Sequence, residues 1–193
     1  MTRTPRTLLP IAALVLACSA ASTVAAQLVG ANYTPPAAGE ALIQKAGASH
    51  SIPNPEFAAP KALAYKVSWD VTEGPAKPDS AVAGFSRAAN FLVMTDDAGV
   101  PRRNVHLALI VHGTATRSLL NAKAYKKETG AENASVALLQ ALHDAGVQII
   151  VCGQALVNRK VPRDQLLPFV KVSTSATLAR AILHAQGYAN FSP

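Results

Sequence analysis

Cysteine is scarce in this chain of 193 residues, which contains only Cys18 and Cys152. Two thiols cannot build the framework of several disulfides that holds many small secreted domains together. No Cys-x-x-Cys or haem-attachment motif occurs either. Stability therefore has to come from a hydrophobic core, and half of the residues are hydrophobic.

Motifs for nucleotides and metals are also missing. The sequence has no Gly-x-Gly-x-x-Gly and no P-loop, so it carries no nucleotide fingerprint. The histidines along the second half of the chain lack the paired spacing of metal ligands: His106, His112, His143 and His184. We expect neither a metal nor another cofactor.

Charged residues are few, at 15%, and the formal net charge is +7. Aromatic residues make up 5% and do not alternate with basic residues as they do in grooves for single-stranded nucleic acid, so no nucleic-acid partner is expected. One basic cluster contains Lys123, Lys126 and Lys127. It fits a solvated helix face, or a rim that attracts anions near a site.

The first 26 residues have the pattern of a secretory signal peptide. Arg3 and Arg6 precede an apolar stretch at residues 8–17, and small residues follow up to a cleavage site after Ala26. The apolar stretch is too short to span a bilayer. We expect a periplasmic or secreted protein. The residues that end at Cys18 also resemble a lipobox, so the alternative is a lipoprotein that a lipid on Cys18 anchors to a membrane.

Two further regions follow the leader. Residues 27–62 contain five prolines with little periodicity, which predicts an extended arm or linker whose middle, residues 39–46, can form a short helix. Residues 63–193 are long enough for one domain with its own core.

Strands and helices alternate through this domain. Alternating apolar and polar residues predict a strand at residues 65–71, and apolar, β-branched runs predict strands at residues 104–113, 147–151 and 170–172. Helical periodicity predicts helices at residues 80–92, 114–127, 133–146 and 176–186. In the last of these helices we expect Ala179, Ile182 and Leu183 to face the core. The pattern is typical of a three-layer α/β/α domain with a mostly parallel sheet.

Three reactive side chains stand at the ends of these strands. Asp70, His112 and Cys152 close the first, second and third strands. Because the carboxyl ends of neighbouring parallel strands meet over one crevice, we expect them to converge there. A histidine can share the proton of a thiol, and a carboxylate can orient the histidine. We therefore identify Cys152 and His112 as candidate catalytic residues and Asp70 as a candidate substrate-binding residue.

The residues beside these side chains are candidates for ligand binding. Gly113 and Gly153 leave room for a ligand to approach the backbone, and the amide of Gln154 is placed to meet a bound anion. Each residue also has a simpler interpretation. Cys152 can be a buried packing residue, His112 a partner of a loop carbonyl, and Asp70 the cap of a turn.

Four segments carry a resemblance to a known family: residues 65–72, 105–113, 147–154 and 166–172. In this order they resemble the DsrE/DsrF-like family of sulfur-relay proteins, and in particular its secreted branch. The resemblance implies a five-stranded parallel sheet between helices, and a homo-oligomer, since trimers and hexamers are common among relatives. It also implies that Cys152 carries sulfur as a persulfide and hands it to a partner.

The chain departs from that family in two ways. Known relays work in the cytoplasm, whereas this chain has an export signal, and no second cysteine of the mature chain can resolve a persulfide. Unidentified donor and acceptor proteins would have to supply and remove the sulfur. Our leading hypothesis is a periplasmic, sulfurtransferase-like sulfur carrier that uses Cys152. The alternatives are a noncatalytic module for small-molecule binding or oligomerisation with a structural cysteine, and a periplasmic redox sensor.

Overall fold

The structure is a computed structural model, and it describes residues 37–191. The predicted signal peptide and Cys18 lie outside the described residues. In chain order the main elements are α1 (Ala37–Ala46), β1 (Tyr65–Val71), α2 (Ser86–Asp97), β2 (Val105–Val111), α3 (Ala122–Thr129), α4 (Val136–Asp144), β3 (Gln148–Cys152), α5 (Gly153–Arg159), β4 (Lys171–Ser173), α6 (Ala176–Ala185) and β5 (Ala189–Phe191). Four short 3₁₀ helices join them: η1 (Ala83–Phe85), η2 (Arg102–Asn104), η3 (Gly113–Leu119) and η4 (Arg163–Gln165).

The five strands form one sheet in the order β4-β3-β2-β1-β5, and every neighbouring pair is parallel. The central strands β2 and β3 are apolar runs of the sequence, as expected for strands covered on both faces, whereas β1 alternates apolar residues with Lys66, Ser68 and Asp70. The five-stranded parallel sheet that the family resemblance implied is therefore confirmed.

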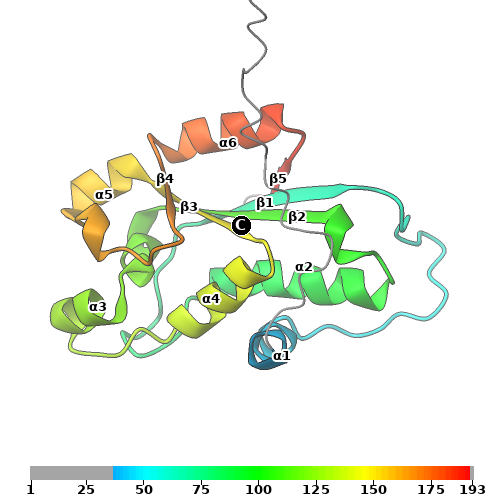
Figure 1. Cartoon of the computed structure of the whole chain (residues 1–193), viewed down its shortest axis with the longest axis horizontal. Coiled ribbons are helices and arrows are strands. Elements are labelled where there is room, and N and C mark those ends of the chain that lie inside the picture. Colours follow the sequence, from blue (N-terminus) through cyan, green and yellow to red (C-terminus); the bar gives the residue numbers. More distant parts are fainter. Residues whose placement is uncertain (1–36, 192–193) are drawn as a thin grey trace, which may run out of the picture. The chain divides into compact units, whose positions relative to one another are not determined.

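Helices cover both faces of this sheet, as Figure 1 shows. Alternate residues of β1, β2 and β3 pack into a large cluster that includes residues of α1, α2 and α4 on one face. The intervening residues of β2 and β3 form a smaller cluster on the opposite face, where α6 contributes Ala176, Ala179 and Leu183. The predicted three-layer α/β/α architecture is confirmed.

Part of the proline-rich region packs onto this domain. Ile43 of α1 is fully buried, and α1 lies against α2 and α4. Arg102 ties the helix down, because its guanidinium contacts both Glu40 and Asp96. Burial alone would lower the pKa of Arg102, but its hydrogen bond and attraction to Asp96, helped by Glu40, raise that pKa above its usual value. The boundary at residue 62 stays a prediction.

Four elements differ from the sequence-based expectation. The helix expected at residues 114–127 is divided into η3 and α3, because Asn121 starts a new helix by accepting a hydrogen bond from the Ala124 amide at 2.9 Å. The residues alone did not predict α5 or β5. The expected burial of Ile182 is wrong: this side chain is 55% exposed, because the buried stripe of α6 follows residues 176, 179 and 183. None of the helices in the described region is long and apolar enough to cross a membrane.

Candidate functional site

The strand ends carry Asp70, His112 and Cys152 to one face of the sheet. Asp70 pairs in register with Ile110 on β2. His112 and Cys152 directly follow a registered pair on neighbouring strands, Val111 and Val151. Because side chains alternate between the faces of a strand, His112, Asp70 and Cys152 share the face that α6 covers. The expected convergence at the carboxyl edge is therefore found at the level of the backbone.

Asp70 and His112 are in direct contact. His112 Nε2 lies 3.0 Å from Asp70 Oδ1, and Asp70 is only 3% exposed. An ionised carboxylate can only accept hydrogen bonds, so Nε2 carries the proton and Nδ1 remains as an acceptor in the neutral ring. The carboxylate thus orients the histidine, as the sequence suggested.

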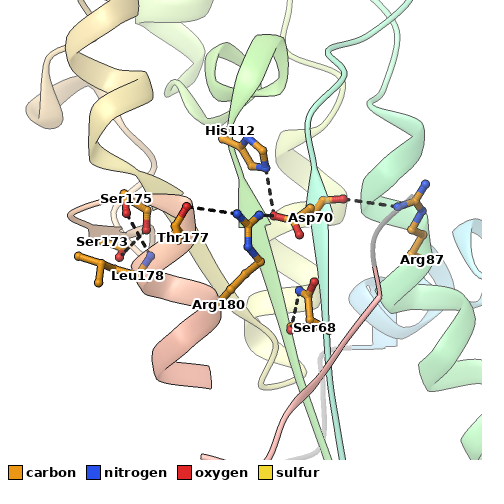
Figure 2. A network of polar contacts seen from close by, with 10 residues as sticks. Ser68, Asp70, Arg87, His112, Ser173, Ser175, Thr177, Leu178 and Arg180 are labelled. Carbon is orange, nitrogen blue, oxygen red and sulfur yellow. Dashed lines mark hydrogen bonds and ion pairs between the residues drawn. The ribbon is translucent and has the colours of Figure 1, made fainter. Parts of the chain in front are cut away.

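A third side chain, Arg180 of α6, completes this cluster. Its Nη1 donates to the same Asp70 Oδ1 at 2.8 Å, and its Nη2 donates to Thr177 Oγ1 at 3.3 Å. Figure 2 shows His112 and Arg180 meeting at Asp70 from two different elements. Sequence reasoning missed Arg180. The only signal was one basic residue beside the apolar stripe of the last helix.

The second carboxylate oxygen of Asp70 is left without a partner. Oδ2 is buried and makes no hydrogen bond within the described part of the chain. An unpaired buried acceptor typically costs about 1–3 kcal/mol. A second arginine, Arg87 of α2, reaches Asp70 only through its backbone, donating to the carbonyl oxygen at 3.4 Å. Among the described residues, side chains therefore donate hydrogen bonds only to Oδ1 of this carboxylate, which has two donors.

Cys152 is a free, buried cysteine with 7% of its surface exposed. It pairs in register with Ser173 and belongs to the apolar cluster under α6, with Ala108, Ile110, Ile150 and Ala176. Among the described residues, no hydrogen bond joins its sulfur to His112. The structure thus brings Asp70 and His112 together as expected. Cys152 lies at the neighbouring position on β3, but it makes no hydrogen bond to the imidazole.

At the two strand-end glycines, neighbouring backbone occupies the space that a side chain would need. A Cβ on Gly113, whose φ is +59°, would lie 2.5 Å from the Thr72 carbonyl oxygen. A Cβ on Gly153 would lie 2.7 Å from the Ser173 carbonyl oxygen. Close packing of adjacent chain segments is enough to explain why glycine stands at both positions. A role of these glycines in ligand binding stays a prediction. Gln154 is exposed in the first turn of α5.

Two shallow pockets lie at the same edge of the sheet. One pocket has a volume of about 370 Å³, and Gly153, Lys160 and Arg163 are among the residues that line it. The other, of about 410 Å³, lies beyond β1 and β2 and includes Tyr125, whose pKa is raised by burial and by the nearby carboxylates of Asp79 and Glu128. In the region that the structure describes, no three histidine, cysteine or acidic side chains gather in a way that could hold a metal.

The sequence of this chain is similar to one known family of proteins. The sequence profile of the DsrE/DsrF-like family matches residues 66–191, which is more than half of the chain. Curated proteins gave no match. Among solved structures, the chain is similar to a protein of unknown function, MTH1491, from Methanobacterium thermoautotrophicum: identity is 17%, the TM-score is 0.47, and the match covers 67% of this chain and 99% of the other. On the strength of the profile match, the chain belongs to the DsrE/DsrF-like family.

Proposed function

We propose that this protein is an exported sulfur carrier that holds sulfur as a persulfide on Cys152. The observation that carries the proposal is the position of Cys152: it ends a central strand of the DsrE-type sheet. A polar cluster of Asp70, His112 and Arg180 lies on the same face. Family membership supports a sulfur-relay role of this general kind.

The proposed chemistry is an exchange between thiolates. The Cys152 thiolate attacks the outer sulfur of a donor persulfide, a new S–S bond forms on Cys152, and the donor leaves as its own thiolate. An acceptor thiolate then attacks the outer sulfur on Cys152, and Cys152 returns to its thiolate form. Neither step needs an oxidant or a reductant, because sulfur passes between partners of the same oxidation level.

His112 is the proton partner in this scheme. Its bare Nδ1 can accept the thiol proton, and Asp70 stabilises the imidazolium that forms. This step needs a rotation or small shift that brings the imidazole toward Cys152, because their hydrogen bond is not formed in the resting arrangement. Asp70, Gly113, Gly153 and Gln154 would border the incoming sulfur group.

Other molecules must deliver and remove the sulfur. Cys152 is the one thiol of the described residues, and Cys18 belongs to the proposed leader. We infer that donor and acceptor proteins dock near the carboxyl edge of the sheet. The leader supports delivery to the periplasm or secretion, and a lipid anchor on Cys18 remains the second form of that proposal.

Mass spectrometry tests the carrier role directly. Protein isolated from the cells that produce it, without reductant, should contain Cys152 with the mass of one extra sulfur atom. Incubation with a polysulfide should load the wild type and leave Cys152→Ser unloaded. A Cys152 that stays unmodified in both preparations contradicts the proposal, and a sulfenic acid or mixed disulfide supports a redox sensor instead.

The burial of Cys152 favours one second candidate. A cysteine that is 7% exposed among alanine and isoleucine side chains fits a packing residue in a noncatalytic binding or oligomerisation module. In that case Cys152→Ser would change stability alone. A carrier, by contrast, would lose polysulfide loading in the same variant while keeping its fold.

A further inference from the structure

Arg180 and His112 contact the same buried carboxylate, that of Asp70. Asp70 is 4% exposed at its side chain, and the negative charge of a carboxylate is expensive to bury unless a cation accompanies it. Arg180 and His112 both reach the single oxygen Oδ1, at 2.8 Å and 3.0 Å. Only one positive charge is needed to balance the carboxylate.

The two donors are not equivalent. A guanidinium is permanently charged, whereas an imidazole can serve either as a neutral donor or as a cation. Because Arg180 already supplies the charge, His112 needs to give only its Nε2 proton. His112 contacts Asp70 of β1, Arg180 of α6 reaches the same carboxylate oxygen, and Cys152 follows Val151, the register partner of Val111, on neighbouring β3.

We propose that Arg180 is a positioning residue that keeps His112 neutral, with Nδ1 free to accept a proton. The benefit of that state rests on the proposed sulfur chemistry, since a bare Nδ1 can take the thiol proton and a doubly protonated ring cannot. Without Arg180, the buried carboxylate has His112 as its only side-chain donor among the described residues and draws a second proton onto the ring.

Long-range ¹H–¹⁵N spectra of the histidine rings test this directly, because ¹⁵N shifts distinguish protonated from bare ring nitrogens. In the wild-type protein at neutral pH, His112 should have one protonated and one bare nitrogen. Arg180→Met, which keeps an apolar stem and removes the charge, should have both nitrogens protonated. Arg180→Lys, which keeps a charge, should return His112 to the wild-type pattern.

Arg87→Met is the matched control. Arg87 also bonds to Asp70, but through the carbonyl oxygen, so its loss should leave the ring nitrogens of His112 unchanged. Figure 2 shows the two arginines on opposite sides of Asp70. The double variant Asp70→Asn/Arg180→Met removes both charges, so it should have a neutral His112, and it keeps the test valid if the single variant folds poorly.

Several results would overturn the proposal. These are a doubly protonated His112 in the wild type, a wild-type ring pattern in folded Arg180→Met, an equal change in Arg87→Met, or a doubly protonated ring in the double variant. The sulfur-carrier proposal fails separately, through an unreactive Cys152. The histidine spectra still decide the role of Arg180 in that case, because they do not depend on the thiol.

Discussion

At the scale of single residues, Gly113 is determined by the backbone beside it. Its φ of +59° is in the left-handed region, and the space of a side chain is occupied by the Thr72 carbonyl oxygen. Gly130 has a similar φ of +76°, but a Cβ there would meet nothing within 4 Å. Substitutions at these two glycines therefore allow the effect of conformational strain to be measured apart from the effect of steric overlap.

Gly113→Ala should lower the free energy of unfolding by about 3 kcal/mol, because strain and overpacking add. Gly130→Ala should lower it by only about 1 kcal/mol, through conformation alone. Urea unfolding of both variants measures the difference. Equal losses in the two variants would show that the contact with Thr72 is not a tight one.

The site residues on strands could be predicted, and the one on a helix could not. Asp70, His112 and Cys152 were found because parallel register brings strand ends to one edge. Arg180 is 110 positions from Asp70 in the sequence, and helical periodicity gives no partner for a polar residue beside a buried stripe. The missing Cys152–His112 hydrogen bond was also unpredictable, because the direction of the imidazole depends on Asp70.

At the scale of elements, α1 is a packed part of the domain and not only a linker. Ile43 is fully buried between this helix and the domain, whereas the adjacent Leu42 is 38% exposed. Proline content made the surrounding region look like a linker, and a ten-residue helix alone is marginal in water. Its stability therefore depends on packing against α2 and α4, which the local sequence does not encode.

Ile43→Ala should lower the free energy of unfolding by about 3 kcal/mol, as for other buried Ile-to-Ala changes. Leu42→Ala, the matched control on the same helix, should change it by less than about 1 kcal/mol. Chemical denaturation followed by circular dichroism measures both. If Ile43→Ala is as mild as Leu42→Ala, α1 contributes little to the stability of the domain.

The strands differ in how well the sequence predicts them. β2 and β3 are largely apolar runs of seven and five residues, β1 alternates apolar and polar residues over seven, and these patterns identified all three strands. β5 is only Ala189–Phe191, with an alternation too short to stand out, and it forms because β1 offers a free edge. The resemblance to the family, and not the local pattern, supplied this fifth strand.

At the scale of the whole molecule, the α/β/α layering follows from the alternation of strands and helices along the chain. Its described surface keeps apolar side chains on two helices: Leu178 and Ile182 of α6 are 49% and 55% exposed, and Val157 of α5 is 74% exposed. Larger apolar patches commonly mark interfaces. We therefore propose a homo-oligomer, a trimer or a dimer.

Light scattering of the leader-free protein at micromolar concentration measures this assembly. We expect a mass of two or three chains, and Ile182→Glu should shift the protein toward the monomer by placing a charge in the interface. A monomer across a dilution series of the wild type would contradict the proposal.

The reactivity of Cys152 in the folded protein tests the sulfur-carrier proposal most directly. Iodoacetamide labelling is followed against pH, with the modified peptide identified by mass spectrometry and Cys152→Ser as the control. We predict that Cys152 reacts while the protein is folded, and that His112→Ala moves its labelling curve to higher pH, because the partner that accepts the thiol proton is gone. Labelling that begins only after denaturation would contradict the carrier role and leave Cys152 as a packing residue.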